Sequence, residues 1–123
     1  MKSYTDLKQS KKLAEILPLE SADICYIKHS SSDNPNWEFN EDFPPMILGN
    51  VPINEMTVEA LPCWSLAALL DVLDFPSLTQ RNENEWEVCI FDHDNDGYIE
   101  KIASNPVDAC MAMIEKLHEL KML

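Results

Sequence analysis

The most constraining feature of this 123-residue sequence is the stretch from Asn105 to Leu120, NPVDACMAMIEKLHEL, which opens with a complete helix start signal. The Asn105 side chain can accept a hydrogen bond from a first-turn N–H, Pro106 gives up a donor that a first turn cannot use, and Asp108 faces the positive end of the helix dipole. We therefore predict a helix over residues 105–120 around which the other elements pack. The residues that recur at helical spacing and form its expected stripe are Val107, Cys110, Met111, Ile114, Leu117 and Lys121, with Ala109, Met113 and Leu120 widening it.

Two further helices are indicated by their start and stop signals. One is predicted over residues 5–16, with Ser3 or Thr5 as its cap and a proline just beyond its end. The other is predicted over residues 65–73, where Ser65 can cap the first turn and a proline again follows the end.

Three stretches have residue patterns typical of β-strands, namely residues 22–28, 85–91 and 98–102. The first has apolar residues at successive positions, so we expect both of its faces to be covered. The second and third are predicted to form a β-hairpin, because the link at residues 95–97, Asn-Asp-Gly, tolerates the positive φ angles of a hairpin turn.

These elements predict the α+β class, with an antiparallel β-sheet packed by helices in an αβα-sandwich-like arrangement. We expect residues 1–123 to form a single domain, and the strand at 22–28 to join the sheet of the hairpin. The serines, asparagines and prolines of residues 30–45 predict a flexible insert. Residues 46–49 are a strand candidate, whereas prolines within and just after residues 51–61 leave that stretch unassigned.

The charge balance limits the classes of partner. Twenty-two acidic residues against nine basic ones give a net charge of −13, which repels nucleic acid and anionic membrane surfaces. We therefore expect no nucleic acid and no membrane as partner, but a protein partner or self-association as a homodimer. The charge is uneven, because the first twelve residues hold four lysines and one aspartate. The acidic surface is interpreted as a solubility feature, with an electrostatic partner as the alternative.

The hydropathy of the chain and its cysteines indicate the cellular compartment of the protein. No apolar run approaches the ~18 residues of a membrane span, and the first residues are not those of a secretory signal, so we predict a cytoplasmic location. Cys25, Cys63, Cys89 and Cys110 lack metal-ligand spacing and are predicted to be reduced, mostly buried thiols. A reactive Cys63 at a helix start is the alternative, although no histidine lies nearby in sequence to act as a base.

The string DHDNDG is the one match to a metal-binding motif. Asp92, Asp94 and Asp96 take positions 1, 3 and 5 of an EF-hand-type calcium loop, and Gly97 takes position 6. Position 12 is Ala103, so the bidentate glutamate is missing, and the flanks are predicted strands instead of helices. A polar hairpin turn explains the same residues. A calcium site of low affinity is kept as an alternative, and we expect no other cofactor.

Three aromatic residues, Trp37, Phe39 and Phe43, lie in the polar insert. Exposed aromatic rings can mark a contact surface, and the alternative is that they fold back over the core. No catalytic residue can be named, because the sequence offers no nucleophile, base and oxyanion set. With glycine only at positions 49 and 97, a glycine-rich phosphate loop is excluded. We therefore expect a protein that is not an enzyme.

Three blocks of the chain resemble a known group of proteins. KQSKKLAEILPLESAD at 8–23, PCWSLAALLDVL at 62–73 and NPVDACMAMIEKLHELKML at 105–123 resemble uncharacterised small proteins of gut Bacteroides and of their prophages and mobile elements. The order of a helix, a tryptophan-containing hairpin and an Asn-Pro-capped terminal helix is similar to the phage ABA sandwich domain over about the last half of the chain. The resemblance implies a layered α/β fold and a phage or mobile-element origin, but no catalytic residues.

The function expected from the sequence is that of a phage or mobile-element accessory protein that acts through protein–protein interaction. One alternative is an acidic DNA-mimic inhibitor of a nucleic-acid enzyme, whose carboxylates would be spaced along one face like backbone phosphates. The other is a weak calcium-binding module at the turn of residues 92–97.

Overall fold

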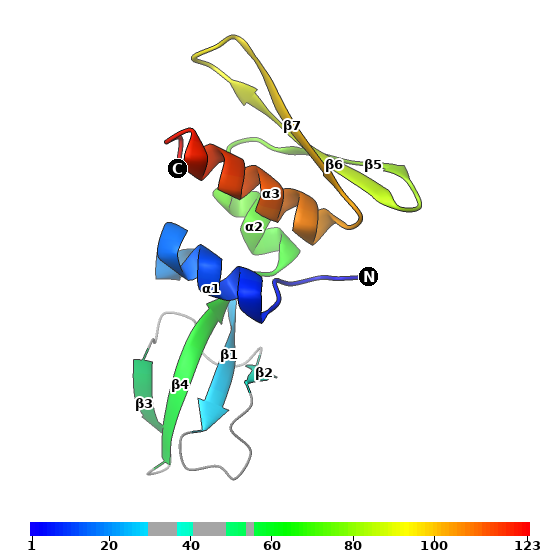
Figure 1. Ribbon diagram of the computed structural model, residues 1–123. Helices are drawn as coiled ribbons and strands as arrows, with labels where there is room; N and C mark the ends of the chain where they lie inside the picture. Colours follow the sequence, from blue (N-terminus) through cyan, green and yellow to red (C-terminus); the bar gives the residue numbers. More distant parts are fainter. Residues whose placement is uncertain (30–36, 41–48, 54–55) are drawn as a thin grey trace. The chain divides into compact units, whose positions relative to one another are not determined.

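The chain contains two compact units, one of residues 6–65 and one that joins residues 1–5 to residues 66–123. Figure 1 shows helices and antiparallel strands along the chain. The α+β class, with antiparallel sheets packed by helices, is confirmed. The structure is a computed structural model and describes residues 1–29, 37–40, 49–53 and 56–123.

The unit of residues 6–65 holds a four-stranded antiparallel sheet of order β2-β1-β4-β3, and helix α1 contacts β4. The helix predicted over residues 5–16 is present, but its cap is Asp6 instead of Ser3 or Thr5. The Asp6 carboxylate accepts from the Gln9 N–H at 2.8 Å, and the Gln9 side chain accepts from the Asp6 N–H at 3.1 Å. This reciprocal capping box satisfies two donors at once, which favours a start after Asp6. The elements are α1 (Leu7–Ile16), the 3-10 helix η1 (Leu19–Ser21), β1 (Ile24–His29), β2 (Glu38–Asn40), β3 (Gly49–Ile53) and β4 (Met56–Cys63).

Strand β1 confirms the strand predicted over residues 22–28, but it lies in a different sheet from the one expected. It pairs with β2 and β4, and not with the predicted hairpin. Residues 25–27 are buried, as expected for a strand covered on both faces. Of the insert predicted at residues 30–45, only residues 37–40 are described, and three of them form β2. The partner was misassigned because the neighbour of β1 in the sheet, β4, had not been recognised as a strand.

Two prolines are the reason that residues 51–61 were not predicted as parts of strands β3 and β4. Pro52 lies in β3, which is an edge strand. Pro62 pairs with Cys25 of β1 and lies beyond Ala60, the last β4 residue paired with β3. Among the residues that the structure describes, each proline therefore lies where its strand has a neighbour on one side only, and a missing N–H is tolerated there. Gly49 begins β3, whereas the rest of the strand candidate at residues 46–49 lies outside the described residues.

The second unit holds a three-stranded antiparallel sheet of order β5-β6-β7 with two helices. The hairpin predicted at residues 85–91 and 98–102 is confirmed, as is the helix predicted at 65–73. Strand β5 was not predicted, because Leu78 is its one apolar residue and most of it is exposed. The elements are α2 (Leu66–Val72), β5 (Ser77–Asn82), β6 (Glu85–Asp92), β7 (Gly97–Ala103) and α3 (Pro106–Glu119).

Helix α3 is the centre of this unit, because it contacts β6, β7 and α2. Asn105 caps it as predicted, accepting from the Asp108 N–H at 2.9 Å. Each large apolar side chain in its buried face contributes roughly 1.5–3 kcal/mol to stability. Leu120 and Lys121 are exposed, contrary to prediction, because α3 ends at Glu119 and Leu120 is the C-cap. The buried apolar face, which otherwise confirms the predicted stripe, comprises Val107, Ala109, Cys110, Met111, Met113, Ile114 and Leu117.

Candidate functional site

The turn between β6 and β7 holds the residues predicted as a calcium site. Asp92 is 6% exposed, and its carboxylate accepts hydrogen bonds from the Asp94 N–H (3.0 Å), the Asn95 N–H (3.3 Å) and the Asn95 side-chain amide (2.7 Å). These donors, the Asn95 amide above all, hold the pKa of Asp92 below its usual range, although burial acts in the opposite direction. Asp92 therefore lies ionised in the turn, with both oxygens bonded to turn donors.

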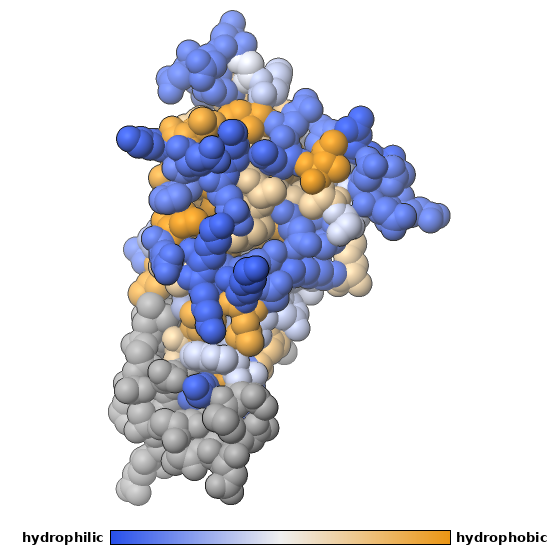
Figure 2. Space-filling model, viewed as in Figure 1, coloured by the Kyte–Doolittle hydropathy of each residue, from blue (hydrophilic) through white to orange (hydrophobic). Residues whose placement is uncertain are grey.

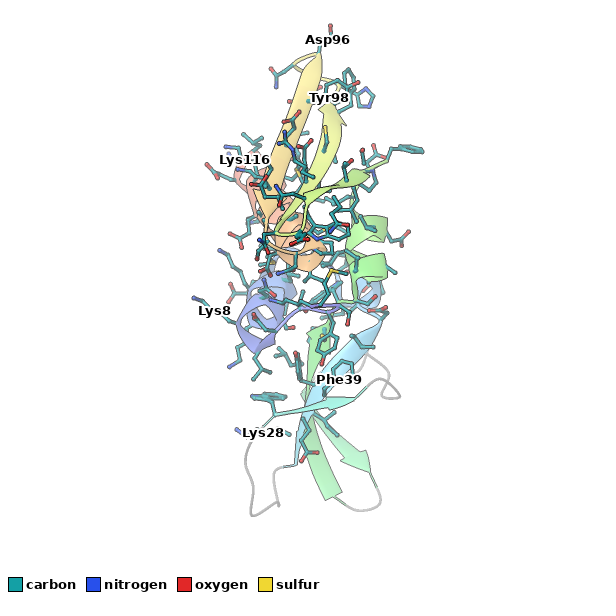
Figure 3. The ribbon with its side chains drawn as sticks, turned by 90° about the vertical axis from the view of Figure 1, so that its right-hand side faces the viewer. Lys8, Lys28, Phe39, Asp96, Tyr98 and Lys116 are labelled. Carbon is teal, nitrogen blue, oxygen red and sulfur yellow. The ribbon has the colours of Figure 1, made fainter. Side chains whose placement is uncertain are left out.

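Asp94 and Asp96 are exposed in the same turn. Asp96 has a φ of 52° and lies at the tip of the hairpin (Figure 3). Aspartate tolerates this left-handed conformation, and it closes the turn before Gly97. No group of three or more histidine, cysteine, aspartate or glutamate residues could hold a metal ion in the part of the chain that the structure describes. The local geometry is that of a hydrogen-bonded hairpin turn, and calcium binding stays a prediction for titration.

Two of the three aromatic residues predicted as an interaction site are described. Phe39 lies opposite Tyr26 of β1, with the ring centroids 6.0 Å apart in an edge-to-face arrangement. The Trp37 ring lies under Lys28 of the same strand, with Nζ 5.9 Å from the centroid. Figure 3 shows Phe39 and Lys28 at this sheet. Both rings thus contact β1, and Phe43 lies outside the described residues.

The four cysteines are reduced thiols, as predicted, with Cys89 half-buried and the others buried. Cys63 is the last residue of β4 and is fully buried, so the alternative of a reactive thiol at a helix start is wrong. Burial raises the pKa of Cys25 to about 11, with a smaller contribution from Cys63, and burial raises the pKa of Cys110 to about 11. The thiolate, which is the nucleophilic form, is therefore scarce at neutral pH.

A cavity of about 190 Å³ is formed where α3 ends. Lys121 has a φ of 61°, and its N–H donates to the His118 carbonyl at 3.0 Å, while the Met122 N–H donates to the Leu117 carbonyl at 2.8 Å. This is the Schellman pattern of helix termination, which reverses the chain and typically brings the two residues of its longer bond into contact. Leu117, Met122 and Leu123 all line the cavity.

The cavity has an apolar interior and an acidic rim. Its apolar lining includes the buried Ile90 and Leu117, and its polar lining includes the exposed Asp74 and Asp94 and the ionised Asp92. No lysine or arginine lines it, and the whole lining belongs to residues 66–123, which are described throughout. A cavity of ~150 Å³ can hold benzene, so this one has room for a single ring or a long side chain.

Phe75 directly follows the cavity residue Asp74 and is 93% exposed, the highest value among the large hydrophobic residues described. Its φ is 47°, in the turn that ends α2. A left-handed backbone costs an L-residue about 1–2 kcal/mol, and glycine or asparagine is usual at such a position. Phe75 thus combines an unfavourable backbone with a ring that has almost no contact with the chain.

An aromatic cluster adjoins the cavity at the end of the hairpin. The Phe91 ring lies edge-to-face with His93 at 4.8 Å and with Tyr98 at 5.2 Å between centroids, and Phe91 and His93 also line the cavity. Tyr98 is 70% exposed, and Ile102 on the same strand is also exposed. Figure 2 shows apolar side chains reaching a surface that is otherwise largely hydrophilic. Exposed apolar side chains therefore occur on β7 as well as at the end of α2.

Sequence reasoning missed both Phe75 and the cavity. The one available signal for Phe75 was an aromatic residue between Asp74 and Pro76, in a turn where polar residues or glycine are usual. The cavity depends on the chain reversal at Lys121, and this reversal could not be predicted because the left-handed position is not occupied by glycine.

No protein-family model, curated protein or solved structure matches this chain. Among the described residues, none of the helices has the length and apolar character that crossing a membrane requires. The chemistry of Phe75 and of the cavity therefore carries the functional proposal.

Proposed function

We propose that this chain is a non-enzymatic protein-binding protein whose contact surface consists of Phe75 and the adjoining cavity, called here the Phe75 surface. The observation that carries this proposal is Phe75 itself, 93% exposed at a φ of 47°. Aromatic residues are enriched at protein–protein interfaces, where a partner covers the ring.

Binding would offset what Phe75 costs the folded chain. The left-handed backbone is disfavoured by about 1–2 kcal/mol, and the exposed ring gains almost nothing from burial. A phenylalanine that buries ~150–250 Å² in an interface contributes about 4–6 kcal/mol at ~25 cal/mol/Å², before the entropy of association is subtracted. The same side chain is thus unfavourable in isolation and favourable in a complex.

The net charge of −13 favours a different protein over a second copy of this chain. Two copies repel each other at long range, whereas a basic partner is attracted and its encounter rate rises. Self-association remains a defined outcome of the experiment below.

The cellular setting of the proposal rests on the resemblance expected from the sequence and on the state of the thiols. We base an accessory role in a phage or mobile element on the sequence resemblance of residues 8–23, 62–73 and 105–123 to small proteins of gut Bacteroides and of their prophages and mobile elements. Four reduced thiols suit a reducing compartment, which supports the cytoplasm as the site of action.

The proposal is tested by replacing Phe75 with the photo-crosslinking residue benzoylphenylalanine in the full chain, expressed in a related bacterial host. Irradiation is expected to give one adduct of discrete mass, in which mass spectrometry identifies the second protein. The matched control places benzoylphenylalanine at Glu83, an exposed position in the turn between β5 and β6, and is expected to give no such adduct.

A second variant separates binding from folding. Phe75→Gly relieves the left-handed backbone, so we expect its melting temperature to rise while the partner no longer co-purifies. The proposal fails if position 75 gives no adduct, if position 83 gives the same adduct, or if Phe75→Gly retains the partner. An adduct of the chain with itself would replace the separate partner by a homodimer.

A further inference from the structure

The cavity of the Phe75 surface offers different chemistry at its interior and at its rim. Val72, Ile90 and Leu117 provide apolar side chains, and Ile90 and Leu117 are buried. Asp74 and Asp94 are exposed carboxylates at the opening, and Asp92 adds a third negative charge close by. A ligand that fits both regions has an apolar stem and a positively charged head.

Other classes of occupant fit less well. An anion would be repelled by the three carboxylates. A neutral apolar group would remove water from Asp74 and Asp94 without replacing their hydrogen bonds, which is unfavourable. A metal ion would require converging oxygens, but both Asp92 oxygens already accept from the turn.

Among cationic side chains, arginine matches the lining best. Its aliphatic stem can lie on Val72, Ile90 and Leu117 while the guanidinium stays at the rim, as long basic side chains commonly do. The guanidinium is planar, less strongly hydrated than an ammonium group, and stacks on aromatic rings such as that of Phe91, which lines the cavity. The volume of about 190 Å³ suits one such side chain.

We propose that the cavity receives an arginine side chain from a basic segment of the protein partner, with the guanidinium directed to Asp74 and Asp94. This inference rests on the proposed function, because it names the chemistry of the partner that Phe75 contacts. It also assigns the acidic surface a role in selecting a basic segment, in addition to solubility.

The test uses butylguanidinium as the probe and butylurea as its neutral, similarly shaped control, each titrated into the ¹⁵N-labelled full chain at low salt. Chemical-shift changes are expected at the amides of residues 92–94 and 117–123, and butylguanidinium is expected to bind about threefold to tenfold more tightly than butylurea. The difference should shrink in 0.5 M NaCl, because salt screens exposed charges.

A matched pair of double variants assigns the effect to the rim. Asp74→Asn with Asp94→Asn is expected to abolish the preference for butylguanidinium. Asp71→Asn with Asp96→Asn removes the same charge from exposed positions outside the lining, and it should leave the preference intact.

Three results would overturn the inference: equal affinity for the two probes, shifts confined to residues outside the lining, or equal effects of the two double variants. These results can be distinguished from a failure of the proposed function, because the proposed function is tested separately by the cross-linked adduct at position 75. An adduct at that position without butylguanidinium binding would reject the arginine site alone.

Discussion

The cap of helix α3 permits a quantitative test of how this unit is held together. Asn105 accepts from the Asp108 N–H at 2.9 Å, and its side-chain amide donates to the Asp108 carboxylate at 2.8 Å. The same carboxylate accepts from Lys2 Nζ at 2.9 Å, so the cap also ties the first residues of the chain to α3. Asn105→Ala removes both hydrogen bonds of Asn105 and leaves the helix sequence unchanged.

The expected loss follows from the geometry of the two bonds. Removing a good N-cap costs about 1 kcal/mol. The second bond reaches a carboxylate whose side chain is 35% exposed, so solvent reduces its contribution to about 0.5 kcal/mol. Asn105→Ala should therefore lower the free energy of unfolding by about 1.5 kcal/mol. Asn105→Ser keeps the acceptor for the Asp108 N–H but lacks the amide donor, so it should cost only about 0.5 kcal/mol.

Urea unfolding followed by far-UV circular dichroism measures both differences. At an m-value of roughly 2 kcal/mol/M, the alanine variant should shift the midpoint down by about 0.7 M with no change in slope. The reasoning is refuted if the alanine variant unfolds at the wild-type midpoint. It is also refuted if serine costs as much as alanine, since the backbone cap would then contribute nothing.

Four further results are expected. Lys121→Gly should raise the free energy of unfolding by about 0.5–1 kcal/mol, because glycine adopts a φ of 61° without strain, and Lys121→Ala in the same urea titration should show no gain. The pKa of Asp92 is lower in the folded chain than its unfolded value of 3.8, so the ionised carboxylate stabilises the fold above pH 3.8, and this stability is lost as the pH falls through the folded pKa. Asp92→Asn should therefore make the melting temperature fall less steeply as the solution is acidified. The pKa values of Cys25 and Cys110 are raised from 9.0 to about 11, so both thiols stabilise the fold below pH 9.0, and this stability is lost as the pH rises through about 11. At pH 8, peptide mapping should find both thiols unmodified by iodoacetamide until denaturant is added. Millimolar calcium should leave the melting temperature of the wild type unchanged, because the Asp92 oxygens are already bonded to the turn, whereas a rise that Asp92→Ala abolishes would restore the calcium interpretation.

Local signals in the sequence predicted the elements whose determinants are themselves local. The Asn-Pro start of α3 and the turn between β6 and β7 lie within a few residues of what they control, and both were located correctly. The sheet that contains β1 was not predicted, because the pairing of β1 with β4 joins residues far apart in the sequence, such as Ile24 and Cys63. Strand β5 carries almost no apolar alternation, since most of it is exposed, so its pairing with β6 was not visible in the sequence.

The candidate site was harder to predict than the fold, because its components are defined by backbone conformation. Phe75 and Lys121 adopt left-handed φ angles without being glycine, and such residues carry no reliable signal in a single sequence. The DHDNDG string was visible, yet the structure uses its first aspartate as an acceptor for the turn. A motif read from letters alone could not distinguish that role from metal coordination.

The path of the chain also bears on how the protein is made. The Leu66 N–H donates to the Ser3 carbonyl at 3.0 Å. The chain therefore leaves the unit of residues 1–5 and 66–123 and re-enters it at neighbouring points, so residues 6–65 form an insertion in the sequence of that unit. During synthesis on the ribosome, residues 1–5 are made before the insertion, whereas their partners Leu66 and Asp108 are made after the whole of it. Residues 1–5 therefore wait for more than sixty further residues before the partners that hold them in the folded unit exist.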